Sequence, residues 1–198
     1  MKKKILITGC SSGLGIFLVN KFESEGHDVL QHLGKKHYDL SDISDIKKLA
    51  EDAIDFKVDV LINNAAIVCP NILLDEYQDE LIISMLDVNL RAPILLTYYL
   101  QSYLSDVINI NSMVGLEYKK NRTLYSATKW GLRGFSNSLK LENSKINILD
   151  VYTTNIKTIP ERENALEVDF VIDSIYKAFE NKENQLILDG RTLWNKQF

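Results

Sequence analysis

The 198-residue chain is poor in cysteine, proline and glycine, of which it has two, three and nine. The two cysteines, Cys10 and Cys69, provide neither the spacing of a zinc site nor a disulfide framework. We therefore expect free thiols in a reducing, cytoplasmic environment. The three histidines are His27, His32 and His37. No carboxylate or cysteine pattern beside them completes a metal site, so we expect surface histidines and no metal.

Long apolar runs and an excess of positive charge are also absent. The wholly apolar stretches are a few residues long, far short of the roughly 18 that a membrane span needs. Lys+Arg number 23 and Asp+Glu 27, for a formal net charge of −4, which argues against general nucleic-acid binding. We expect neither a membrane nor a nucleic acid among the partners. The length and the 45% hydrophobic content indicate a single domain over residues 1–198.

Short apolar runs alternate along the chain with longer segments of helical period. We expect strands at Lys4–Thr8, Val29–Leu33, Val58–Ile62, Val107–Ile110, Ile146–Val151 and Leu186–Leu188. We expect helices at Leu14–Glu25, Ser44–Asp55, Gln78–Leu104, Leu124–Asn143 and Asp169–Asn181. Strands that are apolar throughout are typical of a sheet covered by helices on both faces. The pattern predicts an α/β fold, a doubly wound parallel sheet of about seven strands in a three-layer sandwich.

Helix boundaries agree with this interpretation. Ser41 or Ser44 can begin the second helix, because a serine hydroxyl accepts from the free N–H groups of a first turn. Gly26 follows the first helix, where a left-handed residue is expected. In doubly wound sheets, ligands bind beyond the carboxyl ends of the strands, so the residues after each strand are the candidates for function.

Three of the nine glycines lie within seven residues, between the first strand and the first helix. Glycines allow a tight turn and a close approach of the backbone to a pyrophosphate, and the helix N-terminus offers free N–H groups. Two serine hydroxyls add donors. The alternative is a glycine-rich turn without a ligand. The residues expected to contact the pyrophosphate are Gly9, Ser11, Ser12, Gly13, Leu14 and Gly15.

A second set of residues points to proton chemistry. Tyr125 and Lys129 are four residues apart in an expected helix, which puts both side chains on one face. A neighbouring ammonium lowers the pKa of a tyrosine hydroxyl, and such a tyrosine can act as a general acid or base. Ser112 follows the Val107–Ile110 strand, and its hydroxyl can bond a carbonyl oxygen in the transition state. Taken singly, each feature has an ordinary explanation: a solvated helix face or a turn-capping serine.

Asn89 lies in the long expected helix, four residues before Pro93. Proline has no N–H to bond the Asn89 carbonyl, so the helix should kink there and leave that carbonyl free. The alternative is a helix break without catalytic purpose.

Four features follow one another over nearly the whole chain. They are the Thr8–Gly15 spacing, the Asn63–Ala66 segment after the Val58–Ile62 strand, Ser112, and the Tyr125–Lys129 pair. The combination resembles the short-chain dehydrogenase/reductase family. The resemblance implies a Rossmann-type fold and an NAD(P)(H)-dependent oxidoreductase. Hydride would pass between the nicotinamide and a small-molecule carbonyl or secondary alcohol.

The resemblance also implies residue roles. Tyr125 would donate or accept the proton, Lys129 would lower its pKa and hold the nicotinamide ribose, and Ser112 would polarise the carbonyl. The Asn89 carbonyl would anchor a relay water. Further cofactor contacts would come from Lys35, Asp39, Leu40, Asn64, Ala65 and Ile156. The family favours a homodimer or homotetramer through the long helix and the Tyr125 helix. The alternative function is a catalytically silent NAD(P)-binding regulatory protein.

The chain departs from the family pattern at several points. Ala66 replaces a glycine, and the turn at 153–158 lacks its Pro-Gly pair. Only five residues separate Leu33 from Asp39, which leaves room for a very short third strand at His37–Asp39. About ten residues lie between Thr158 and the last helix, where relatives carry a substrate lid. We therefore expect a more open site.

Basic residues bear on cofactor and substrate choice. Leu33 stands where an acidic residue would bond the ribose of NAD, and Lys35 and Lys36 follow, which favours NADP. Ser12, in a position often basic in NADP-using relatives, favours NAD, and the lysines are otherwise an ordinary solvated turn. Lys119, Lys120 and Arg122 precede Tyr125. They either attract an anionic substrate or belong to a solvated loop.

Overall fold

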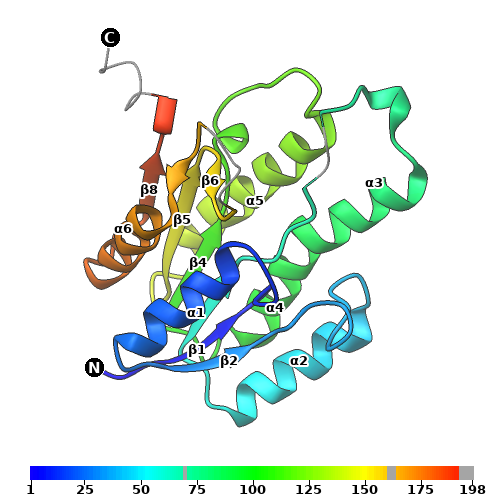
Figure 1. Ribbon diagram of the computed structural model, residues 1–198. Helices are drawn as coiled ribbons and strands as arrows, with labels where there is room; N and C mark the ends of the chain where they lie inside the picture. Colours follow the sequence, from blue (N-terminus) through cyan, green and yellow to red (C-terminus); the bar gives the residue numbers. More distant parts are fainter. Residues whose placement is uncertain (69–70, 160–163, 192–198) are drawn as a thin grey trace.

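The computed structural model describes residues 1–68, 71–159 and 164–191. Among these residues, the main sheet has six parallel strands in the order β2-β1-β3-β4-β5-β8 (Figure 1). Its strands are β1 Lys4–Ile7, β2 Asp28–Gln31, β3 Val60–Asn63, β4 Asp106–Ile110, β5 Asn147–Thr153 and β8 Gln185–Leu188. A separate parallel pair joins β6 (Ile156–Lys157) to β7 (Leu166–Glu167). The predicted α/β fold with a Rossmann-like strand order is confirmed, with six strands in the main sheet instead of seven.

Helices cover both faces of the sheet. They are α1 Leu14–Ser24, α2 Ile43–Asp55, α3 Asp79–Leu86, α4 Ala92–Leu100, α5 Thr123–Glu142 and α6 Val168–Glu180. Because side chains alternate along a strand, Ile5 and Ile7 pack in a core with α1 and α6, whereas Leu6 packs in a second core with α2 and α4. Because the strands of the main sheet are parallel, their carboxyl ends and the segments that follow them lie at one edge of the sheet.

The expected strand at His37–Asp39 is wrong. The N–H groups of His37 and Tyr38 both donate to the carbonyl of Gly34, at 2.9 and 3.2 Å. Gly34 has a φ of +91°, a conformation that glycine adopts without strain. The short connection therefore forms a turn before α2 instead of a third strand. As a result, β2 is the edge strand of the sheet.

Two local predictions about the helices have different outcomes. The N-cap of α2 is Asp42, whose side chain accepts from the N–H of Ser44 at 2.6 Å, so neither Ser41 nor Ser44 caps the helix. Gly26 has a φ of +89°, as expected after a helix end. The carboxylate takes the capping role because it also complements the positive end of the helix dipole.

The expected helix at Gln78–Leu104 is interrupted. A π-helical turn at Asp87–Arg91 separates α3 from α4, and Pro93 lies in the first turn of α4. Proline cannot continue the regular ladder, which explains the change of pitch. By length and composition, the stretch Asp79–Leu100 would also pass for a membrane span, with a mean hydropathy of 1.4. In this fold α4 packs against α2 and α5.

The expectation of surface histidines is wrong for two of the three. His27 and His32 are 8% and 2% exposed, whereas His37 lies at the surface. His27 packs among the aromatic rings of Phe22, Tyr176 and Phe179. Cys10 is a buried free thiol, and Cys69 lies outside the described residues.

Candidate active site

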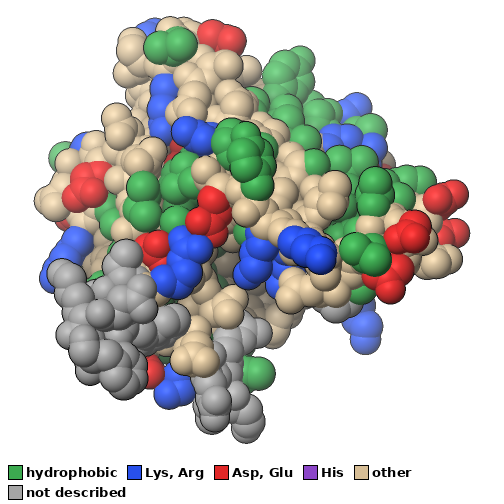
Figure 2. All heavy atoms as spheres, turned by 90° about the horizontal axis from the view of Figure 1, so that it is seen from above, with side chains coloured by type: hydrophobic (Ala, Val, Ile, Leu, Met, Phe, Trp, Pro, Cys, Tyr) green, Lys and Arg blue, Asp and Glu red, His purple; other side chains and the backbone are tan. Residues whose placement is uncertain are grey.

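A cavity of about 760 Å³ opens at the carboxyl ends of the strands. Figure 2 shows the molecule from above, the side toward which β5 and β8 point in Figure 1, with Lys and Arg side chains gathered around the middle of the face. Most of the predicted site residues line this cavity. They are Gly9, Ser11, Ser12, Gly13, Leu14, Lys35, Asp39, Leu40, Asn64, Ala65, Ser112, Tyr125, Lys129 and Ile156. Gly15 and Asn89 are not among the described lining residues.

The glycine turn has the close packing that a dinucleotide cradle requires. Gly9 has a φ of +73°, and a Cβ there would lie 2.8 Å from the Ala65 Cα. A Cβ on Gly15 would lie 2.1 Å from the carbonyl oxygen of Gly9. Gly13 begins α1 without a side-chain cap, so the first N–H groups of the helix remain available to an anion. These residues fit a bound pyrophosphate.

Asn64 and Thr8 lock the end of β3 to the glycine turn. The Thr8 Oγ1 accepts from the N–H groups of Asn64 and Ala65, each at 3.0 Å. The Asn64 Nδ2 donates to the carbonyl oxygens of Thr8 and Gly9 at 2.8 and 3.0 Å. Ala66, the departure from the family pattern, lines the same cavity. Asn64 therefore has a structural role in addition to any contact with a cofactor.

Tyr125 and Lys129 lie on the face of α5 that borders the cavity. The Lys129 Nζ is 5.7 Å from the centre of the Tyr125 ring and donates to the carbonyl oxygen of Ile110 at 2.9 Å. The side chain is 3% exposed, and this burial lowers the pKa of Lys129 to about 8. At neutral pH, a positive charge thus stands beside the tyrosine.

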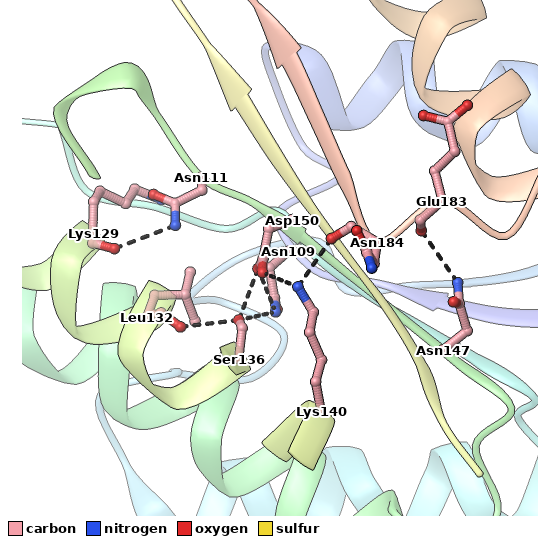
Figure 3. Close-up of polar contacts among 10 residues, drawn as sticks. All are labelled: Asn109, Asn111, Lys129, Leu132, Ser136, Lys140, Asn147, Asp150, Glu183 and Asn184. Carbon is pink, nitrogen blue, oxygen red and sulfur yellow. Dashed lines mark hydrogen bonds and ion pairs between the residues drawn. The ribbon is translucent and has the colours of Figure 1, made fainter. Parts of the chain in front are cut away.

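Ser112 and Asn111 follow β4 and meet α5. The Ser112 N–H donates to the Asn111 Oδ1 at 2.9 Å, and the Ser112 Oγ accepts from the N–H of Val114 at 3.4 Å. The Asn111 Nδ2 donates to the backbone carbonyl of Lys129 at 3.2 Å (Figure 3). Asn111 therefore ties the serine to the helix that carries the tyrosine and the lysine, although no sequence pattern singled it out.

Asn89 lies behind this group. Its Oδ1 accepts from the N–H of Ile67 at 2.7 Å, and its Nδ2 donates to the Ile67 carbonyl at 2.8 Å. The same amide lies 3.5 Å from the Thr128 hydroxyl on α5. The Asn89 side chain thus holds the segment after β3. Its backbone belongs to the π-helical turn and not to a regular α-helix.

A buried polar cluster between α5 and the strands β4 and β5 holds α5 in place (Figure 3). Asp150 of β5 is 1% exposed. It accepts from the Ser136 hydroxyl at 2.7 Å and pairs with the Lys140 Nζ at 2.8 Å. Asn109 of β4 donates to both Ser136 and Asp150, at 2.9 and 3.3 Å. Since Ser136 and Lys140 share a helix with Tyr125, these bonds position the tyrosine above the strand ends.

The connection after β2 forms one side of the cavity. The Lys35 Nζ pairs with the Asp39 carboxylate at 3.0 Å, and Asp39 also accepts from the Ser41 N–H and hydroxyl at 2.9 and 2.7 Å. Leu40 is buried at 5% exposure, whereas Leu33 is 51% exposed.

Several lining residues were missed or left open at the level of sequence. His32, which was expected at the surface, lines the cavity. Its place after the strand was hidden because β2 ends at Gln31, two residues before the expected end at Leu33. Lys119 and Arg122 line the cavity, and Lys120 is not among the described lining residues. The Arg122 guanidinium lies 5.8 Å from the centre of the Tyr125 ring.

A family model for the short chain dehydrogenases matches residues 35–166, so the chain belongs to the short-chain dehydrogenase/reductase family. The match includes Tyr125 and Lys129 and begins after the glycine turn. Sorbitol-6-phosphate 2-dehydrogenase of Klebsiella pneumoniae is 25% identical, over 82% of this chain and 73% of its own. The chain is shorter than its typical relatives.

Two solved structures show the same fold. A short-chain dehydrogenase from Sphingobium yanoikuyae in complex with NADPH has a TM-score of 0.78 at 23% identity, over 93% of this chain and 87% of its own. A 4-hydroxyisoleucine dehydrogenase complexed with NADH has a TM-score of 0.80 at 22% identity, over 96% and 97%. Neighbours of this fold thus bind either nicotinamide cofactor.

Proposed function

We propose that the protein is an NAD(P)(H)-dependent oxidoreductase that interconverts a small carbonyl compound and a secondary alcohol, with Tyr125 as the acid/base. The observation that carries this proposal is the meeting of two groups at one cavity. Ser112, Tyr125 and Lys129 line it together with the glycine turn. A cofactor held at the turn could therefore reach a substrate beside the tyrosine.

In the direction of reduction, the bound nicotinamide supplies a hydride to the carbonyl carbon. The Ser112 hydroxyl donates a hydrogen bond to the carbonyl oxygen and stabilises the charge that develops there. The Tyr125 hydroxyl donates its proton to the same oxygen. The Lys129 ammonium, 5.7 Å from the ring, stabilises the resulting phenolate. As the family resemblance implies, the backbone carbonyl of Asn89 in the π-helical turn would anchor a relay water, while its side chain is bonded to Ile67.

NADP is the proposed cofactor. Leu33 offers no carboxylate to the ribose, and Lys35 lines the cavity beside it. The Lys35 ammonium is paired with Asp39 at 3.0 Å. Binding of a 2′-phosphate would require Lys35 to turn from Asp39, which its 81% side-chain exposure allows.

Deuterium transfer tests the proposal. Reduced cofactor labelled with deuterium at nicotinamide C4 is incubated with the protein and a panel of ketones and aldehydes, and the alcohols are analysed by mass spectrometry. The proposal predicts deuterium on the carbinol carbon of at least one product. Tight cofactor binding without labelled product across a wide panel would instead support the silent regulatory protein.

A further inference from the structure

His32 joins the glycine turn to the connection that follows β2. Its Nδ1 lies 3.1 Å from the Gly9 amide nitrogen, and its Nε2 lies 2.8 Å from the Tyr38 carbonyl oxygen. The side chain is 2% exposed and lines the main cavity. One imidazole thus contacts two separate walls of the candidate cofactor site.

The partners of the ring define its protonation state. The Gly9 N–H can only donate, so the Nδ1 of His32 must carry a lone pair. The Tyr38 carbonyl can only accept, so the Nε2 must carry the hydrogen. The contacts are compatible with the neutral imidazole alone, in its Nε2–H form. An added proton would place two donors, the Nδ1–H and the Gly9 N–H, against each other.

Gly9 is the residue on which this contact acts. Its carbonyl oxygen accepts from Asn64 at 3.0 Å, and its amide donates to His32. Its φ of +73° and the 2.8 Å clearance to Ala65 leave no room for a side chain. The course of the glycine turn, whose residues 11–14 line the cavity, therefore depends on bonds from both sides of this one residue, together with the backbone bond from the Cys10 N–H to the His32 carbonyl at 2.9 Å.

Tyr38 is the corresponding residue on the other wall. Its carbonyl oxygen is held by His32, and it directly precedes Asp39 and Leu40, which line the cavity. Within the connection, the N–H groups of residues 37 and 38 bond Gly34, and the Asp39 N–H donates to Asp45 of α2 at 3.0 Å. His32 adds the side-chain contacts that join this connection to the glycine turn.

We propose that His32 is a positioning residue for the nicotinamide dinucleotide. As a neutral imidazole it holds the glycine turn and the connection after β2 at a fixed separation. Its protonation breaks the contact with the Gly9 N–H, while the Nε2–H keeps the Tyr38 carbonyl, and the displaced glycine turn binds the cofactor more weakly. The inference rests on the proposed function, since it requires that this cavity bind the cofactor.

The surroundings of the ring set the direction of the pH effect. The titratable residues in contact with His32 are Cys10 on the glycine turn and His37 and Tyr38 on the connection. Lys35 and Asp39 of the connection line the same cavity. Burial is the main cause that lowers the pKa of His32 from 6.5; the Tyr38 carbonyl opposes this shift and nearby His37 adds to it. Burial also raises the pKa of the Cys10 thiol to about 12, so Cys10 stays neutral. Cofactor affinity should be full near neutral pH and fall in acid.

Three variants separate positioning from simple packing. His32→Gln keeps an acceptor and a donor at the end of the side chain but does not titrate. His32→Ala removes both. His37→Gln is the matched control: its ring stacks on His32 at 6.4 Å, and it is a second histidine of the same connection. The dissociation constants of NADPH and NADH are measured by cofactor fluorescence from about pH 8 to about pH 5, and thermal unfolding checks that each variant is folded.

The wild type and His37→Gln should bind the cofactor up to about tenfold more weakly at the acid end of this range, as expected when one bond to a turn is lost. His32→Gln should bind nearly as well as the wild type near pH 8 and lose the pH dependence, and His32→Ala should be weaker throughout. The ¹⁵N spectrum of the cofactor-free wild type should show a neutral His32 with its proton on Nε2. A pH dependence that persists in His32→Gln, or a proton on Nδ1, would overturn the inference alone. Absence of binding by the wild type near pH 8 would overturn the proposed function as well.

Discussion

Lys129 places a positive charge 5.7 Å from the centre of the Tyr125 ring. Because the side chain is buried, this charge depends on pH. The side chain is 3% exposed and bonds only the Ile110 carbonyl among the described residues. Burial lowers its pKa to about 8, from 10.5 in an exposed lysine. Near neutral pH the ammonium is present, but the folded protein holds it at a cost in stability.

This cost has a measurable pH dependence. Between about pH 8 and 10.5 the unfolded chain retains a proton that the folded chain has lost, so the free energy of unfolding rises with pH. Relative to Lys129→Met, which cannot titrate, the wild type should gain about 3 kcal/mol across this range. Urea unfolding at several pH values provides the measurement. The Lys36→Met variant, which keeps Lys129, is the control and should gain the same stability as the wild type across this range. A constant difference between the wild type and Lys129→Met would contradict the buried, titrating ammonium.

Lys35 is the residue on which the proposed preference for NADP depends. Lys35→Ala should weaken NADPH binding about fivefold to tenfold, the loss of one exposed charge-assisted contact, and leave NADH binding unchanged. Lys36→Ala is matched in charge and neighbouring in sequence, but its side chain is not among the described lining residues, so both affinities should persist. Titration of each variant with each cofactor measures this. Tighter NADH binding by the wild type would contradict the preference.

The position of α5 decides whether Ser112, Tyr125 and Lys129 meet. The helix carries the tyrosine, and the buried cluster beneath it joins β4 and β5 to its later turns. Asp150 lies at the centre of this cluster, at 1% exposure. Its carboxylate is the shared acceptor for a hydroxyl, an amide and an ammonium.

Asp150→Ala should therefore destabilise the fold by about 2–3 kcal/mol, because it removes a buried charged acceptor that a hydroxyl, an amide and an ammonium share. The partly exposed Lys140 keeps the Asn184 carbonyl as an acceptor, which limits the loss. Denaturant unfolding measures the loss. The exposed ion pair between Lys157 and Glu167, with side chains 37% and 70% exposed, offers the comparison: Glu167→Ala should cost less than about 1 kcal/mol. Equal, small effects of the two substitutions would show that the cluster does not hold α5.

At the scale of the whole molecule, the helices α3 to α5 leave large apolar side chains at the surface. Ile83, Tyr98 and Leu141 are 59%, 63% and 89% exposed. We propose that these helices associate in a homodimer or homotetramer, in line with the family. Sedimentation velocity should show a species larger than a monomer, and Tyr98→Glu should shift it toward the monomer. A monomeric wild type at high concentration would contradict this assembly.

Much of the fold was predictable from the sequence because its signals are local and repeated. The sequence indicated the buried strands found at Val60–Asn63 and Asp106–Ile110, because a strand covered by helices on both faces is apolar throughout. The break near Asn89 was expected because Pro93 has no N–H. The strand expected at His37–Asp39 is absent, and the turn found there was not predictable, because bonds to the Gly34 carbonyl decide its conformation. His32 was misjudged for a similar reason: a histidine in isolation does not reveal that two backbone groups from distant segments bracket its ring.

The central claim is that Tyr125 transfers the proton in a hydride-transfer reaction at this cavity. The most direct test compares turnover and cofactor binding in the wild type and in Tyr125→Phe, which removes the hydroxyl and keeps the ring. The account predicts loss of turnover by at least about 10²-fold, the range for a missing general acid, with the cofactor dissociation constant nearly unchanged. Turnover close to the wild-type rate in Tyr125→Phe would contradict it.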